Sequence, residues 1–282
     1  MRRKQLIVNA DDYNTDSERN RGILEAARQG IVTSVSVLTN LPGDETARQE
    51  LRETFKNNIG VHLNLTNGLP LSRDNATLTD AAGRFFSKPG AWARALLGTY
   101  ALREVASEFE AQINRLVRDG IVPDHIDGNN HIHVFPGIAG VTAGLARRFG
   151  IHCIRLPREP LPGPAQLFRA GGIKKMLFLF LCRSARNRFL QAGLRFTDRV
   201  AGIQHPAAGD VAALRSFLQT LPGGTTELMC HPGYAARNEN PFSTDRRRQE
   251  LGALTHPEVL QDIKKYGIIL SSYADLGGSS RS

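Results

Sequence analysis

The stretch of the chain from 125 to 133 concentrates side chains that could do chemistry. It holds three of the chain's eight histidines, His125, His131 and His133, together with Asp127. Imidazole and carboxylate groups bind metal ions and transfer protons in hydrolytic sites. If the backbone is extended here, positions 125, 127, 129, 131 and 133 share one face of a strand. A polar, asparagine-rich loop that happens to contain histidines is the alternative interpretation.

Three other places in the sequence carry comparable side chains. Two adjacent carboxylates, Asp11 and Asp12, directly follow an apolar run, and a lone His62 lies inside another one. His231 precedes a Pro-Gly pair that is typical of a turn. Each has an ordinary explanation: a helix N-cap, a hydrogen-bonded core histidine or a turn residue. Because a hydrolytic site needs a base, an acid and metal ligands, the four places together favour one shared site.

The elements that would position these residues alternate between short apolar strands and longer helical patterns. We expect strands at 6–9, 35–38, 59–63, 125–127, 152–156, 227–230 and 268–270, and helices at 17–29, 45–55, 101–118, 138–149, 211–219 and 257–265. In the helix at 101–118, Val105, Phe109, Ile113, Leu116 and Val117 lie on one apolar side, and the stretch from 67 to 90 reads as loop.

The repeated strand–helix units predict an α/β fold with a parallel sheet. Their number favours a closed barrel over an open doubly wound sheet. In such a barrel, the carboxyl ends of the strands form the face on which active sites are built, and all four candidate places fall at strand ends. No glycine-rich nucleotide-binding motif follows the first strand.

The composition limits the class of protein. Hydrophobic residues make up 41% of the 282 residues and charged residues 22%, as in ordinary soluble proteins. The net charge of +9 favours anionic partners, but no long basic tract or aromatic pattern indicates nucleic acid. The three cysteines do not suggest a disulfide framework, and no apolar run is long enough for a signal peptide or a membrane span. We therefore expect a cytoplasmic protein.

Several ordered motifs resemble those of the YdjC-type carbohydrate deacetylases, a family that includes chitooligosaccharide deacetylases and a member associated with hopanoid biosynthesis. The resemblance runs from Leu6 to about Leu276. The motifs are Asn9-Ala10-Asp11-Asp12-Tyr13, Gly30-Ile31-Val32-Thr33-Ser34, Gly60-Val61-His62-Leu63-Asn64-Leu65, His125-Ile126-Asp127, His131-Ile132-His133-Val134-Phe135-Pro136 and Glu227-Leu228-Met229-Cys230-His231-Pro232-Gly233. The resemblance implies one distorted (βα) TIM-like barrel domain over 1–282 and a metal-dependent hydrolase that removes acetyl from an N-acetylated sugar, an oligosaccharide or a lipid-linked glycan.

Carried over position by position, the resemblance also implies roles. Asp11 matches the general base, Asp12 and His62 match metal ligands, and His231 is the candidate general acid. His125 and Asp127 match the shell that orients the site. His133 and Asn64 are further candidates for binding or orienting the substrate.

Two positions depart from the family pattern. Asn14 stands where a glycine is usual, a mild change because asparagine tolerates positive φ. Asn129 stands where a third metal-binding histidine is expected. An amide oxygen suits Mg²⁺ but is a poor replacement for imidazole on Zn²⁺. Either Asn129 ligates the ion, or His131 takes its place, or the site holds metal poorly, so the choice between Mg²⁺ and Zn²⁺ stays open.

Two other functions stay open for the same reason: a protein that binds N-acetyl sugars without hydrolysing them, and a metal hydrolase acting on another bond. The basic and apolar segment from about 160 to 196 reads as an inserted helical region. It could pack on the barrel, cover the site, form a homodimer contact or make a peripheral membrane contact through 172–190.

Overall fold

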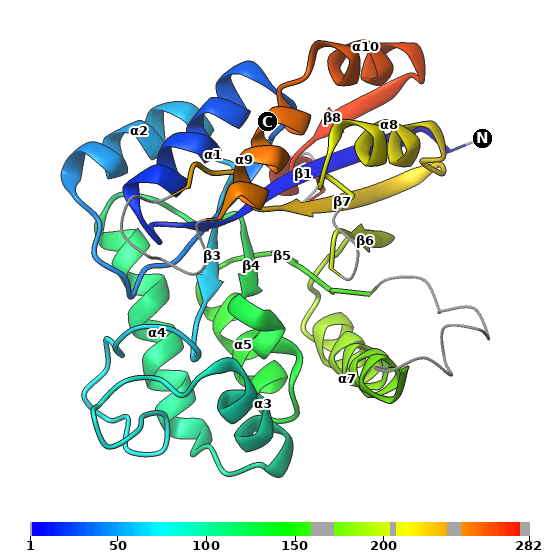
Figure 1. Ribbon diagram of the computed structural model, residues 1–282. Helices are drawn as coiled ribbons and strands as arrows, with labels where there is room; N and C mark the ends of the chain where they lie inside the picture. The colour runs from blue at the N-terminus through cyan, green and yellow to red at the C-terminus, as the bar shows by residue number, and fades with distance from the viewer. Residues whose placement is uncertain (1, 159–171, 204–206, 236–243, 277–282) are drawn as a thin grey trace.

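A computed structural model describes residues 2–158, 172–203, 207–235 and 244–276, with the side chains of 172–175 excepted. One sheet of eight parallel strands forms its centre, and helices surround the sheet (Figure 1). The strands are β1 Lys4–Tyr13, β2 Ser34–Val37, β3 Ile59–Leu63, β4 His125–Gly128, β5 Cys153–Ile154, β6 Arg199–Ala201, β7 Gly224–Cys230 and β8 Ile268–Ser271.

The strand order explains the distorted shape of the sheet. The strands follow one another as β5-β4-β3-β2-β1-β7-β6, and β8 pairs with the first residues of β1, beside β2 on the same edge. The two ends of the sheet meet through an isolated parallel bridge between Cys153 and Arg195, four residues before β6, and through the backbone N–H of Val200 in β6, which donates to the backbone oxygen of Arg158 at 3.5 Å. The expected parallel α/β barrel is therefore confirmed as a half-barrel, whose seam is not a continuous ladder.

The helices before β8 connect successive strands, and α11 follows β8. They are α1 Ser17–Gln29, α2 Glu45–Phe55, α3 Lys88–Leu97, α4 Leu102–Arg118, α5 Ile138–Arg148, α7 Gly172–Gln191, α8 Val211–Gln219, α9 Asp245–Leu254, α10 Pro257–Lys265 and α11 Tyr273–Leu276, with a 3₁₀ turn, η1, at Asn129–Val134. Asp16, Asp44 and Asp210 cap α1, α2 and α8 by accepting a backbone N–H three residues further on, which satisfies a donor that the helix cannot.

Some expected elements differ from the structure. The presumed loop at 67–90 runs into α3, because Pro89 occupies the first turn of a helix, where its missing N–H costs nothing. In α4 the predicted apolar side is buried except for Val117, which is exposed. Helix α7 occupies most of the inserted segment, while 159–171 lie outside the described residues. Among the described helices, none has the length and apolar character needed to cross a membrane.

Candidate active site

The two aspartates of β1 lie inside the strand, not after it as expected. The register of β1 against β2 shifts between Ala10 and Tyr13, and Asp12 adopts a φ of 72°. Such a bulge adds a residue to one strand and breaks the strict alternation of side chains. As a result, the carboxylates of Asp11 and Asp12 both reach His62 of β3.

Arg155, which directly follows β5, organises the carboxylates at this end of the sheet. Its guanidinium is fully buried, and its two terminal nitrogens each lie 2.7 Å from a different oxygen of Asp11. It also lies 2.7 Å from Asp127 Oδ2 and 2.6 Å from Glu227 Oε1. Paired, fork-like hydrogen bonds of this kind fix the orientation of a carboxylate as well as neutralising its charge. Burial alone would raise the pKa of Asp127, but Arg155 and His62 outweigh it and hold this pKa well below its ordinary value.

His62 connects the two sides of the cluster. Its Nδ1 lies 2.6 Å from Asp127 Oδ1, and its Nε2 lies 3.5 Å from Asp12 Oδ1. Burial alone would lower the pKa of His62, but Asp127 and the neighbouring aspartates raise it to about 9. The other oxygen of Asp12 accepts a hydrogen bond from the buried Arg19 at 2.8 Å. Burial would raise the pKa of Asp12, but Arg19 and His231 lower it.

The cluster offers donor atoms for a metal ion in two arrangements. Asp11, His62 and Asp127 could hold one, since one donor atom from each lies within 4.8 Å of the others. In this arrangement, however, Arg155 occupies both Asp11 oxygens and His62 Nδ1 occupies Asp127 Oδ1. Asp12 Oδ1 and His62 Nε2 are the better placed pair, because two ligands about 2.1 Å from one ion at a tetrahedral angle lie about 3.4 Å apart.

The backbone after Asp127 does not stay extended, so the expected shared face from 125 to 133 is wrong. Strand β4 ends at Gly128, and η1 follows with Asn130 and His131 both at positive φ, 52° and 58°. Asparagine and histidine enter this left-handed region more readily than most residues. The turn therefore takes positions 129, 131 and 133 off the strand face that His125 and Asp127 share.

Each candidate in η1 has its own surroundings. Asn129 Oδ1 accepts a hydrogen bond from the side chain of Asn130 at 2.7 Å. His131 Nδ1 is buried and has no hydrogen-bond partner among the described residues, and burial lowers the pKa of His131 well below its ordinary value. His133 Nε2 donates to the backbone oxygen of Arg155 at 2.9 Å, so this side chain supports the segment directly after β5 that carries Arg155.

His125 and Asn64 are both fully buried and extensively bonded. His125 lies 2.6 Å from Asp124 Oδ1 and 3.1 Å from Ser36 Oγ, which in turn donates to Asp127. A Cβ at Gly60 would lie 2.3 Å from the His125 ring, so this glycine makes room for it. The side-chain oxygen of Asn64 accepts from the backbone of Thr66, and its amide donates to the following loop. His125 therefore supports Asp127 from behind, while Asn64 shapes the loop after β3.

His231 directly follows β7 and lies at the edge of the cluster. Its backbone N–H donates to Glu250 at 2.7 Å, which fixes the turn. Its side chain keeps 21% exposure, unlike the buried groups around Arg155. Burial and Arg247 lower the pKa of His231 from its ordinary value, against the attraction of Glu250 and Asp12.

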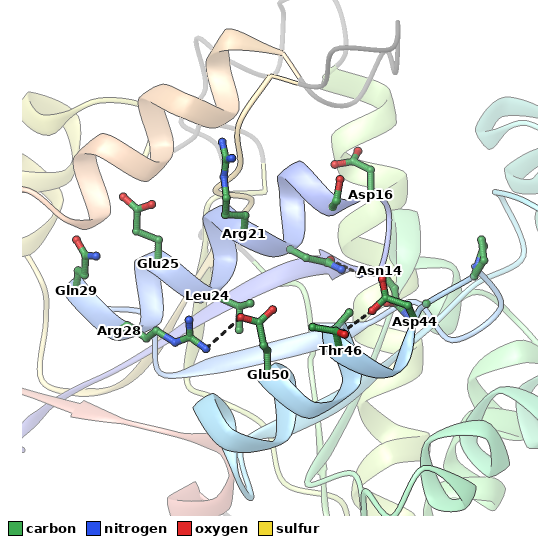
Figure 2. Close-up of a pocket in the computed structure, with 15 residues that line it drawn as sticks. Asn14, Asp16, Arg21, Leu24, Glu25, Arg28, Gln29, Asp44, Thr46 and Glu50 are labelled. Atoms are coloured by element: carbon green, nitrogen blue, oxygen red, sulfur yellow. Dashed lines mark hydrogen bonds and ion pairs between the residues drawn. The ribbon is translucent and has the colours of Figure 1, made fainter.

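A separate pocket of about 520 Å³ lies between α1 and α2 (Figure 2). Figure 2 shows charged side chains from both helices around it, and Arg28 pairs with Glu50 at 3.7 Å. Asn14 also lines it, in the left-handed conformation that its position was expected to require. This pocket does not include the aspartates and histidines of the cluster, so the candidate site is defined by the cluster.

Comparison with known proteins agrees with these motifs. The family model for YdjC-like proteins matches residues 5–265. The carbohydrate deacetylase of Mus musculus is 34% identical, with 97% of this chain and 95% of that protein covered, and the carbohydrate deacetylase of Brevibacillus brevis is 31% identical, with 97% and 100% covered. The chitooligosaccharide deacetylase of an Enterobacter species is 30% identical over 97% of this chain and 99% of its own.

A solved structure also matches across the whole fold. It is that of a protein proposed to cleave cellobiose phosphate, from Enterococcus faecalis V583. It has a TM-score of 0.76 and 27% identity, with 97% of this chain and 99% of that chain covered. Because the family model spans most of the sequence and full-length relatives exceed 30% identity, this chain belongs to the YdjC-like protein family.

Proposed function

We propose that the protein is a metal-dependent carbohydrate deacetylase, which hydrolyses the amide bond of an N-acetylated sugar to acetate and an amino sugar. The observation that carries the proposal is the pairing of Asp11 with Arg155 next to the Asp12–His62 pair. It combines an oriented carboxylate, suited to act as a base, with two donor atoms spaced for one ion. The full-length relatives named carbohydrate deacetylase support the same chemistry.

Asp12 Oδ1 and His62 Nε2 would hold the ion, with Asn129 as the third protein ligand and His131 as its alternative. The hydrogen bond between His62 Nδ1 and Asp127 suits this role, because it leaves Nε2 to face the ion. When bound, a divalent ion polarises the amide carbonyl of the substrate. With an amide oxygen at position 129 the donor set is richer in oxygen than an Asp-His-His set, which favours Mg²⁺ over Zn²⁺.

Asp11 would remove the proton from the attacking water. Its Oδ1 accepts from both Arg155 and Asn9, whereas its Oδ2 accepts only from Arg155 among the described residues. Since a carboxylate oxygen can accept two hydrogen bonds, Oδ2 is the atom that would take the proton. Arg155 keeps this oxygen aimed at one place during the reaction.

His231 would donate a proton to the leaving amine. It is the more exposed histidine at the edge of the cluster, so its proton can be replaced from solvent. A lowered pKa makes its protonated form a stronger acid but a less populated one at neutral pH. His125, Asp127 and His133 would orient the groups that touch the substrate.

The test is acetate release from N-acetylated oligosaccharides with added Mg²⁺, Zn²⁺ or Co²⁺, with and without a chelator. We expect release that depends on metal and that falls by about 10²–10⁴ in Asp11→Asn, the usual contribution of a general base. Undiminished release in this variant would remove Asp11 as the base. Metal-dependent cleavage of a phosphoester, with no acetate released, would instead support a hydrolase of another bond.

A sugar-binding protein without hydrolysis is the second candidate. It is favoured by one observation, the Asn130 amide that already occupies Asn129 Oδ1. Binding of an N-acetylated oligosaccharide with no acetate release under any of the three metals would establish this function instead.

The protein's organisation and location complete the proposal. All described strands belong to one sheet, which supports a single domain over 1–282. The described cysteines, Cys153, Cys182 and Cys230, are buried free thiols, which supports a reducing cytoplasmic location. A homodimer and a peripheral membrane contact through α7 are further partner proposals.

A further inference from the structure

The positive charge of this chain is concentrated in one stretch of the sequence. Residues 128–197 contain 11 of the 36 Lys and Arg but only one of the 27 Asp and Glu. The net charge of this stretch, +10, exceeds that of the whole chain, +9, so the rest is close to neutral. Arg155 is buried and pairs with carboxylates in the core, and Arg148 pairs with Glu110. Arg183 and Arg188 have no ion pair among the described residues.

Helix α7, within this stretch, is apolar on two sides. Its inner side, with Phe178, Leu181 and Phe189, is buried and contacts α5 and η1. Met176, Leu177 and Phe180 are exposed, with 66% of Phe180 accessible. Phe180 lies four residues after Met176 and three after Leu177, so it neighbours both of them on one side of the helix. Scattered exposed apolar residues are ordinary, but three gathered on one helical turn mark a contact surface.

Basic residues accompany this apolar face along the helix. Arg183 and Arg188 are exposed further along α7, and Lys174 and Lys175 precede the apolar residues in the sequence. The sequence of the helix contains no Asp or Glu. Apolar side chains combined with basic ones and no acidic ones match a bilayer surface, which offers an apolar boundary under anionic headgroups. A polyanion such as nucleic acid would satisfy the charge but not the apolar face.

We propose that the exposed face of α7, formed by Met176, Leu177, Phe180, Arg183 and Arg188, docks the protein on an anionic phospholipid bilayer. Phe178, on the opposite side of the helix, contacts His131 of η1 with ring centroids 5.5 Å apart. Docking therefore places η1, and the candidate site beside it, about one helix diameter, roughly 10 Å, from the lipid surface. This inference deepens the peripheral membrane contact proposed above and is independent of the proposed deacetylase reaction, because it rests on the outer face of a helix that supplies no reacting group.

The test is co-sedimentation of the full chain with phosphatidylcholine vesicles, with and without phosphatidylglycerol. We expect binding only to the anionic vesicles and a loss of binding at high salt, which screens the charges. Phe180→Ser should weaken binding about tenfold, since it removes a large apolar side chain from the lipid boundary. Arg183→Gln and Arg188→Gln should each weaken it about fivefold.

Val122→Ser is the matched control, because Val122 is 68% exposed in the segment before β4, far from α7 in the sequence. It should bind vesicles like the wild type. No sedimentation with anionic vesicles at low salt would overturn the proposal, as would equal effects of Phe180→Ser and Val122→Ser. Equal retention of wild type and Phe180→Ser on heparin, without vesicle binding, would show general polyanion binding instead. A dimer that Phe180→Ser dissociates would assign this face to a second copy of the chain.

Discussion

Arg155 holds Asp11 through two hydrogen bonds of 2.7 Å, one to each carboxylate oxygen. Both side chains are buried. Asp11 lies in β1, whereas Arg155 directly follows β5, the strand at one end of the sheet order. The pair therefore links the seam of the half-barrel to its central strand. The carboxylate of Asp11, the proposed base, gains its orientation from the part of the sheet that is least completely closed.

Arg155→Lys tests this pairing. A lysine keeps the positive charge but cannot form the paired hydrogen bonds, so Asp11 loses its fixed orientation. We expect kcat for acetate release to fall about a hundredfold with little change in KM, since misplacement of a catalytic group by about 1 Å can cost that much. Steady-state kinetics would measure it. A rise in KM with kcat unchanged would show that Arg155 binds substrate instead.

The control for Arg155→Lys is a comparison of its free energy of unfolding with that of Arg155→Met. Arg155→Met leaves Asp11, Asp127 and Glu227 buried without their partner and should lower the free energy of unfolding by about 3–5 kcal/mol. Urea unfolding would show this loss, and the lysine variant should lose less. Loss of activity in the lysine variant without such destabilisation separates a positioning role from a purely structural one.

Asn129→His tests the departure from the family pattern. A histidine at this position supplies the imidazole that Zn²⁺ prefers. We expect Zn²⁺ affinity to rise roughly tenfold or more, since an added ligand should contribute at least the 1.4 kcal/mol that a tenfold change represents. Titration calorimetry with Zn²⁺ and with Mg²⁺ would measure both affinities.

Two variants control this experiment. Asn187→His adds the same imidazole on the exposed face of α7 and should leave both metal affinities unchanged. Asn129→Ala removes the amide oxygen and should weaken Mg²⁺ binding. If Asn129→Ala binds Mg²⁺ like the wild type, Asn129 is not a ligand. His131 is then the next candidate, because its buried Nδ1 has no hydrogen-bond partner in the described part of the chain.

Trp92 provides an optical report on the same turn, because it is the only tryptophan in the sequence. Its indole N–H donates to the backbone oxygen of Asn130 at 3.0 Å, and its ring stacks on Phe178 with centroids 6.0 Å apart. An ion bound by Asn129 would reorient this turn, so we expect Trp92 emission to change on titration with metal. The change should be absent in Asn129→Ala. Identical titrations of both proteins would indicate that the ion does not engage η1.

The sequence predicted the positions of residues on regular strands more accurately than those of residues in bulges and turns. His62 and Asp127 lie on strands whose alternation is readable from apolar runs, and the structure brings them together. The expected barrel follows from the same runs. Helix α3 was missed because Pro89 and Gly90 are typical of turns as well as of a first helical turn.

The rest depends on features that periodicity does not record. The bulge at Asp12 and the left-handed pair Asn130 and His131 are single-residue backbone choices stabilised by tertiary contacts. Arg155 was also missed, although a signal existed: an arginine between Ile154 and Leu156 in a predicted buried strand needs carboxylate partners. The same reasoning applies to Glu227, which has apolar residues on its carboxyl side and accepts from Tyr273 and Arg155.

The pKa of His62 predicts opposite pH effects on the metal-free and the metal-bound protein. Its folded-state pKa of about 9 lies above the ordinary 6.5, so charged His62 stabilises the metal-free fold fully below pH 6.5. That contribution, of order 3 kcal/mol at most, is lost as the pH rises through 9.

Metal binding needs the unprotonated Nε2 of His62, so the ion competes with a proton below pH 9. Apparent metal affinity should therefore rise up to about tenfold per pH unit and level off near pH 9. Urea unfolding and calorimetry across pH 6–9 would measure the two trends, and His62→Gln should flatten both. Metal affinity that stays constant over this range in the wild type would remove His62 as a ligand.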